Sequence, residues 1–130
     1  MKMFSRWLAV CSLALAATGA TAQDSGTIRV VLPFGPGSGT DNVARPLFEE
    51  VGRELNQTAV IDNRPGAGTV IGTALAAKSV PDGYTLFQAN AAHTINPALM
   101  RKLPYDTQRA FTPVTLSAEL PNVLVLHPSV

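Results

Sequence analysis

The chain has 130 residues, of which 46% are hydrophobic and 15% are charged. That composition fits a globular chain with enough residues for one domain and its core, and it excludes a disordered protein. The formal net charge is only +1 at pH 7, which excludes a global field that would attract nucleic acid or an anionic membrane.

The N-terminus has the order of a secretory signal. Lys2 and Arg6 supply a positive start, residues 7–17 are mostly apolar, and an Ala-x-Ala sequence ends at Ala22. The apolar run is too short for a membrane-spanning helix, which needs about 20 apolar residues. We therefore expect residues 1–22 to be a signal peptide, with export to the periplasm and cleavage after Ala22.

Cleavage would change the chemistry available to the chain. Cys11 is the single cysteine, and Val10 precedes it where a lipoprotein signal needs a small residue. The mature part then has no disulfide, thiol nucleophile or thiolate ligand. Loss of Lys2 and Arg6 leaves 8 basic and 9 acidic residues, a net charge of −1. Any anion site must therefore be local, built from backbone amides or a few side chains.

The remaining sequence alternates between strand and helix patterns. The β-branched run at 28–34 is typical of a buried parallel strand. The elements predicted after it are a helix at 40–55, a strand at 59–62, a helix at 69–78, a strand at 84–89, a short helix at 96–100, and strands at 111–116 and 122–127. This alternation predicts an α/β domain with a mostly parallel sheet flanked by helices. Because the last strand has no helix after it, the domain is expected to be interrupted.

The two longer helices have predicted core faces. Val43, Leu47, Val51 and Leu55 repeat every four residues and form one apolar stripe, and Pro46 is expected to kink that helix. Ser38 or Thr40 is the expected N-cap, with Asp41 at the positive end of the helix dipole. The second helix is expected to pack through Ile71, Ala74 and Leu75.

Three loops follow the carboxyl ends of predicted strands, at 35–39, 63–68 and 90–93. These ends meet at one edge of a parallel sheet, where ligands of such folds bind. Glycines allow a carboxylate or phosphate close to the backbone, and helices that begin there point free N–H groups outward. One such loop would indicate no more than a tight turn, but three at one edge favour a ligand site.

An enzyme is the competing hypothesis. Gly35, Gly37 and Gly39 between a strand and a helix imitate a dinucleotide-binding unit, but Thr40 stands where the third glycine of that fingerprint belongs. No histidine pair has metal-ligand spacing and no serine lies in a nucleophile elbow. We therefore expect no catalytic residue, no metal and no cofactor.

For several polar residues the sequence allows either a ligand-binding or a structural role. His127 is expected to end a strand, whereas His93 either bonds a ligand or has a structural role. Asp41 either accepts a bond from a ligand or stabilises the first turn of its helix. Arg64 either pairs with a carboxylate or holds its loop through Asp62.

The loop sequences carry a family resemblance. Residues 31–41, VLPFGPGSGTD, resemble the first loop of the Bug-type (TctC-like) receptors, the extracytoplasmic binding proteins of tripartite tricarboxylate transporters. Residues 62–68, DNRPGAG, resemble their second loop, and residues 81–86, PDGYTL, resemble the entry to their third strand. Further matches follow in the family's order at 93–99, 103–106, 111–114, 121–125 and 127–129.

The resemblance implies a two-lobed periplasmic binding fold of type II, with residues 23–130 as the first lobe, truncated before the second. Family members hold small organic carboxylates between the lobes and deliver them to inner-membrane transporter subunits, as monomers without nucleic acid. Carried over by motif, the ligand contacts are Phe34, Gly37, Ser38, Gly39, Asp41, Ala67, Gly68, Asn90, His93 and Asn96. The alternatives are an exported sensor that feeds a signalling receptor, a fragment without function, and the dinucleotide enzyme.

Two departures from the family pattern affect the expected ligand. Ser38 stands where the family often has glycine, which adds a hydroxyl and narrows the pocket. Thr69 and Val70 stand where the family often has Gly-Asn. These departures leave the fold expectation intact and the identity of the carboxylate open.

Overall fold

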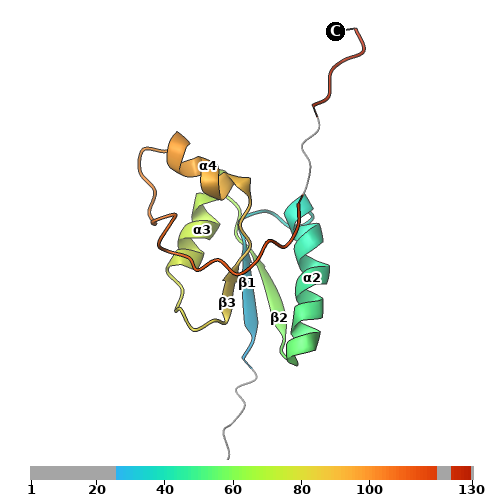
Figure 1. The fold of residues 1–130 in the computed structure, drawn as a ribbon, viewed down its shortest axis with the longest axis vertical. Coiled ribbons are helices and arrows are strands. Elements are labelled where there is room, and N and C mark those ends of the chain that lie inside the picture. The colour runs from blue at the N-terminus through green and yellow to red at the C-terminus, as the bar shows by residue number, and fades with distance from the viewer. Residues whose placement is uncertain (1–25, 120–123, 130) are drawn as a thin grey trace, which may run out of the picture.

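Figure 1 shows the computed structural model of the chain, which describes residues 26–119 and 124–129. The predicted signal peptide and residues 122–123 of the last predicted strand lie outside the described residues. The described part contains a three-stranded sheet with the order β2-β1-β3. The strands are β1 (Ile28–Leu32), β2 (Ala59–Asn63) and β3 (Thr85–Phe87).

All the described strand pairs are parallel. Val30 of β1 lies opposite Ile61 of β2 on one side and Leu86 of β3 on the other. The central position explains why the β-branched run of β1 is the most buried strand: Val30, Val31 and Leu32 are fully inaccessible to solvent. The predicted α/β class with a parallel sheet is confirmed.

Helices cover both faces of this sheet. They are α2 (Gly39–Leu55), α3 (Val70–Ala77), which follows the short 3-10 turn η2 (Ala67–Thr69), and α4 (Ala91–Leu99). In Figure 1, α2 packs on one side of the sheet and α3 on the other, with α4 at the end where β3 finishes. The α2 helix continues through Pro46 as one element.

The core lies between β1 and α2, and the predicted stripe of α2 is confirmed in part: Leu47 and Val51 pack against the core as partly buried side chains. Ala44, Phe48 and Gly52 are buried against the sheet, whereas Leu55 is 57% exposed. At Gly52 a Cβ would lie 2.8 Å from the carbonyl oxygen of Gln57, so glycine lets the turn after α2 pack closely against the helix.

The same correction applies to α3. The predicted contact residue Ile71 is 55% exposed, and the buried residues are Gly72 and Thr73. Small side chains let α3 approach the sheet closely, so the face in contact is not the most apolar face. The helix α4 begins five residues before its predicted start because Asn90 caps it, its Oδ1 accepting from the N–H of Ala92 at 3.0 Å.

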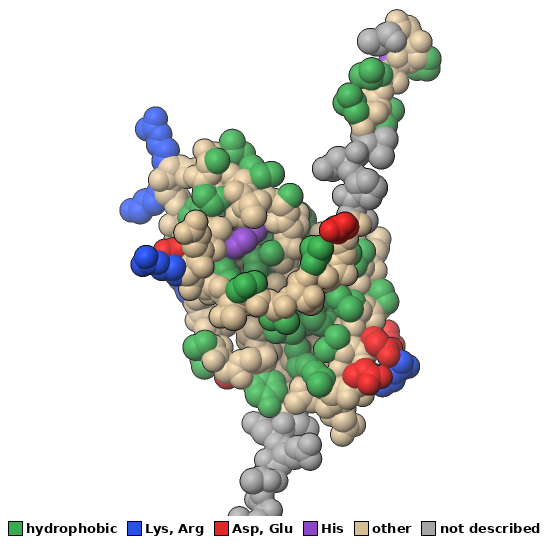
Figure 2. Space-filling view, viewed as in Figure 1, with side chains coloured by type: hydrophobic (Ala, Val, Ile, Leu, Met, Phe, Trp, Pro, Cys, Tyr) green, Lys and Arg blue, Asp and Glu red, His purple; other side chains and the backbone are tan. Residues whose placement is uncertain are grey.

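Residues 101–119 form an irregular segment, which we call the strap, that crosses the sheet in front of β1 and β3 in Figure 1. The strand predicted at 111–116 is wrong, and residues 124–127 of the last predicted strand are also not in a strand. Both segments have strand-like composition, but a strand also needs a neighbouring edge to pair with. Figure 2 shows apolar side chains gathered on the face that the strap crosses, and Val114 and Leu124 are more than 80% exposed.

Candidate functional site

The three predicted loops do leave one edge of the sheet. Because β1, β2 and β3 are parallel neighbours, the chain leaves Leu32, Asn63 and Phe87 on the same side. Backbone bonds extend the pairing just past the strand ends: the N–H of Arg64 donates to Leu32 O at 2.7 Å, and the N–H of Gln88 donates to Val31 O at 3.1 Å. The loop after β1 is therefore flanked by the other two.

Asp41 organises the first loop. Its side chain is almost fully buried, and it accepts bonds from the backbone N–H of Gly37 at 2.8 Å and from Arg45 Nε at 2.8 Å. Gly37 has a φ of +77°, which glycine adopts without strain. Ser38 is the N-cap of α2, and its Oγ accepts from the N–H of Asp41 at 3.3 Å. The expected Ser38 cap and the position of Asp41 in the first turn of α2 are confirmed.

The electrostatics of this loop follow from the same contacts. The bond from Arg45, helped by those from Gly37 and Asn63, lowers the pKa of Asp41 from 3.8 to about 2. In return, the bond to Asp41 raises the pKa of Arg45. The carboxylate therefore stays ionised at neutral pH and is balanced by one guanidinium, so this ion pair adds no net charge to the first loop.

Asn63 is a site residue that sequence reasoning treated only as part of a turn. Its Nδ2 donates to Phe34 O and to Asp41 Oδ1, both at 3.0 Å, and its Oδ1 accepts from Arg45 at 3.1 Å. It thereby ties the end of β2 to the loop after β1. The available signal was an amide at the end of a strand beside a loop with a buried carboxylate.

The second loop has a left-handed backbone over four successive residues. The φ angles are +128° at Gly66, +46° at Ala67, +60° at Gly68 and +81° at Thr69. Positive φ costs a residue with a side chain roughly 1–2 kcal/mol, so Ala67 and Thr69 are strained. Thr69 stands where the family resemblance expects glycine, and its φ is one that glycine adopts easily.

A buried polar cluster surrounds the end of this turn. The side chains of Thr69, Thr73 and Asn96 are almost fully buried. Asn96 Nδ2 donates to Gly68 O at 2.9 Å and to Thr69 Oγ1 at 3.2 Å, and Thr73 Oγ1 donates to Thr69 O at 2.9 Å. Asn96 thus joins α4 to the second loop.

His93 lies in an aromatic cluster that fixes the strap. Its ring packs edge-on against Phe87 and Phe111, with centroids 5.6 and 5.2 Å apart, and is nearly parallel to the ring of Tyr105 at 6.3 Å. His93 Nδ1 and Tyr105 Oη are buried without a bonding partner among the described residues. Gln88 Nε2 anchors the strap further by donating to Ser117 Oγ at 2.6 Å. These contacts give His93 a structural role, and its contact with a ligand stays a prediction.

Arg64 holds its loop through Asp62, which is one of the two roles that the sequence allowed. Its Nε donates to Asp62 Oδ1 at 2.7 Å, and Arg29 bonds the other carboxylate oxygen. Burial raises the pKa of Asp62, but the bonds from Arg29 and Arg64 outweigh that effect and lower it. The guanidinium of Arg64 therefore holds the strand end and is partly neutralised.

Backbone donors remain at this edge of the sheet. Within the described part of the chain, the N–H groups of Gly39, Thr40, Ala67 and Gly68 have no backbone or side-chain acceptor. Gly39 and Thr40 open α2, where the helix dipole is positive. The Cβ positions at Gly35, Gly37 and Gly39 face open space, so the backbone there is accessible. This arrangement can bind a small anion through amide donors.

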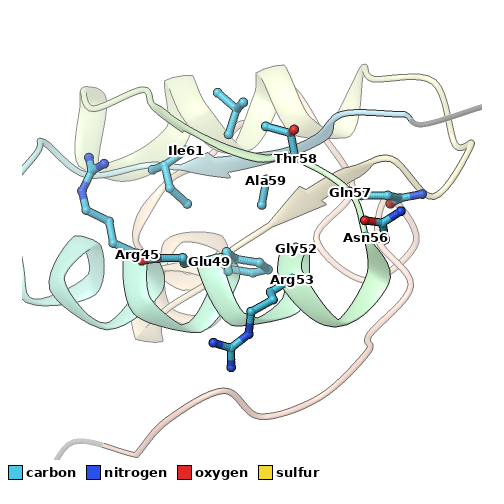
Figure 3. Close-up of a pocket in the computed structure, with 11 residues that line it drawn as sticks. Arg45, Glu49, Gly52, Arg53, Asn56, Gln57, Thr58, Ala59 and Ile61 are labelled. Carbon is cyan, nitrogen blue, oxygen red and sulfur yellow. The ribbon is translucent and has the colours of Figure 1, made fainter.

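A separate groove of about 910 Å³ lies elsewhere on the molecule, between the second half of α2 and β2. Figure 3 shows Glu49, Gly52 and Arg53 on the α2 side, and Gln57, Thr58 and Ala59 on the facing turn and strand. It flanks the unpaired edge of β2 and is widely open, so we assign the candidate site to the loop edge instead. Among the described residues there is no cluster of potential metal ligands and no helix long and apolar enough to cross a membrane.

Residues 43–130 match the model of the tripartite tricarboxylate transporter family receptor. The chain belongs to this family. It is a family of periplasmic binding receptors rather than of enzymes. Protein BugT of Bordetella pertussis is 38% identical over 95% of this chain, and a protein from the tcbD-tcbE intergenic region of Pseudomonas sp. strain P51 is 36% identical over 93%. The chain spans about 40% of the length of these relatives.

Solved structures similar to this chain have the same fold. The periplasmic binding protein BugD is 38% identical, with a TM-score of 0.64 over 67% of this chain and 29% of its own. MatC from Rhodopseudomonas palustris, solved with bound malate, is 39% identical, with a TM-score of 0.64 over 68% of this chain and 30% of its own. The open parallel sheet flanked by helices is therefore the fold of periplasmic binding proteins.

Proposed function

We propose that this protein is an extracytoplasmic solute receptor that captures a small organic carboxylate and delivers it to a tripartite tricarboxylate-type membrane transporter. The observation that carries the proposal is the similarity to MatC, a protein of the same fold solved with bound malate. In this proposal the protein acts in the periplasm as a monomer, after cleavage following Ala22. Residues 23–130 belong to its first lobe, and a second lobe supplies the opposite wall of the site.

The loop edge supports a carboxylate as the ligand class. A carboxylate is an acceptor-only group, and it is matched by the unpaired N–H donors at the start of α2 and in the second loop. We propose that the ligand contacts these donors and the open backbone from Gly37 to Gly39, with the Ser38 hydroxyl as one further donor. Backbone N–H donors can select a ligand by its charge and shape without a lysine side chain. A site of this kind agrees with the small net charge of the chain.

The remaining proposed contacts lie around these donors. Phe34, Ala67, Gly68 and Asn90 belong to the three loop segments, and His93 lies on the first turn of α4. Asp41 is already saturated by bonds within the protein, so we propose that it holds the first loop in shape around the ligand.

The test is a thermal-shift and calorimetric titration of the purified chain with malate, citrate, glutamate and benzoate. Binding at about 100 times Kd stabilises a native protein by about 2.7 kcal/mol. Dimethyl malate, which keeps the shape but lacks both charges, is the matched control and should give no shift. A cooperative melt unmoved by every carboxylate would mean that residues 23–130 do not bind without the second lobe, whereas a shift with NAD alone would contradict the proposal and favour the dinucleotide enzyme. The intact mass of the exported protein tests the cut after Ala22.

A further inference from the structure

The left-handed turn at residues 66–69 needs something to hold it. Ala67 and Thr69 both have side chains and both have positive φ, which an isolated chain would avoid. Residues in such conformations persist only where the surrounding structure over-determines them. The turn also exposes the N–H groups that the proposed function assigns to the ligand.

The polar groups that hold the turn come from two helices. Thr73, on the following helix α3, binds the carbonyl of Thr69. Asn96 comes from α4, 27 residues further along the chain than Thr69, and its amide group donates both to Gly68 O and to Thr69 Oγ1. These two acceptors use both hydrogens of Nδ2, since an amide nitrogen carries two. Asn96 is only 4% exposed, and its donors are spent inside the protein.

We infer that Asn96 is a positioning residue, which holds the turn at residues 66–69 in the conformation that presents its N–H groups to the ligand. The value of this role for ligand binding rests on the proposed function, whereas the contacts of Asn96 with Gly68 and Thr69 do not depend on it. It replaces the direct ligand contact that the family motif implies for Asn96. Through it, α4 connects the end of β3 to the loop after β2, so the positions of the second and third loops depend on each other.

The first test uses the native full chain without substitution. Two-dimensional NMR follows hydrogen exchange of side-chain amides, and Asn42 is the internal reference because its side chain is exposed. The side-chain amide protons of Asn96 should exchange at least tenfold more slowly than those of Asn42. Equal rates at the two amides would overturn the inference, whether or not the protein binds malate.

The second test removes the donors. Asn96→Asp keeps the size of the side chain but replaces its NH₂ group by an oxygen that faces Gly68 O. The backbone amide of Val70, which donates to Ala67 O within the turn, should then exchange at least tenfold faster, while the amides of β1 keep their rates. Thr94→Ala, on an exposed position of the same helix, is the matched control and should change neither. Unchanged exchange at Val70 in a folded Asn96→Asp variant would overturn the inference.

A rescue separates positioning from ligand contact. Thr69→Gly relieves the positive φ and removes the hydroxyl that Asn96 satisfies, so in the Asn96→Asp background it should recover part of the lost protection and malate affinity. If Asn96 touched the ligand directly, exchange at the Val70 amide would stay normal in Asn96→Asp and Thr69→Gly would restore no affinity. Failure of the native chain to bind malate would count against the proposed function alone, because both exchange measurements still decide the role of Asn96.

Discussion

Gly72 is the position where one added methyl group should disturb the site most. A Cβ there would lie 2.6 Å from Arg64 O and 2.9 Å from Pro33 Cα. Both atoms are backbone, at the roots of the second and first loops, so neither can rotate away. Overpacking of this kind costs typically 1–3 kcal/mol. Alanine gains up to about 1 kcal/mol over glycine within a helix. Because the overlap is with backbone, we expect Gly72→Ala to lower stability by a net amount of about 2 kcal/mol.

For a domain of this size, such a loss lowers the Tm by roughly 8–16 °C. The measurement is thermal and urea unfolding followed by circular dichroism. The matched control is Gly39→Ala, which adds the same methyl to a helical glycine that faces open space. The control should be neutral or stabilising by less than about 1 kcal/mol. If Gly72→Ala were as stable as the control, the close contact of α3 with the loop roots would be refuted.

Three further predictions concern acid stability, the helix cap and the strap. The folded pKa of Asp41 lies below its ordinary value, so its contribution to stability is present above 3.8 and is lost as the pH falls to about 2. Urea titrations in this range should show a shallower pH dependence for Asp41→Asn, with a remainder from Asp62, whose pKa is also lowered. Ser38→Ala should lower the free energy of unfolding by about 1 kcal/mol through loss of the α2 cap, whereas Ser38→Asp, which keeps an acceptor, should restore most of it. Phe111→Ala removes the ring that lies 5.0 Å from that of Phe87, and limited proteolysis should then cut the strap faster; Val114→Ala, at a position 82% exposed, should not change the rate.

Each of these three has an outcome that would contradict it. An Asp41→Asn variant with the same pH dependence as the native protein would mean that its carboxylate is not stabilised by Arg45. A Ser38→Ala variant of unchanged stability would show that another group caps α2. Equal cleavage of Phe111→Ala and Val114→Ala would show that the aromatic cluster does not hold the strap.

The sequence determined the local elements and the edge at which the loops meet. The uninterrupted run from Ile28 to Leu32 predicts a buried strand of a parallel sheet because its residues are mostly β-branched and apolar. Alternation of strands and helices implies parallel pairing, and parallel pairing places the glycine-rich loops together. The Ser38 cap was also predictable, since a cap involves residues only three positions apart.

Only the tertiary structure decided the helix faces and the strand pairing. Gly52 and Gly72 make close contacts with backbone outside their own helices, and the periodicity of a helix sequence does not show such contacts. Residues 111–116 have strand composition, but pairing requires a free edge nearby, and in the structure they cross the sheet as part of the strap.

The polar contacts that hold the site were beyond the sequence for the same reason. Asn63 meets Asp41 across 22 residues, and Asn96 meets Gly68 across 28. Periodicity and turn chemistry describe neighbours along the chain, whereas these bonds form only after the sheet has brought distant loops together. The left-handed turn at 66–69 is stable because of such a contact, so its conformation is a property of the folded domain and not of its own four residues.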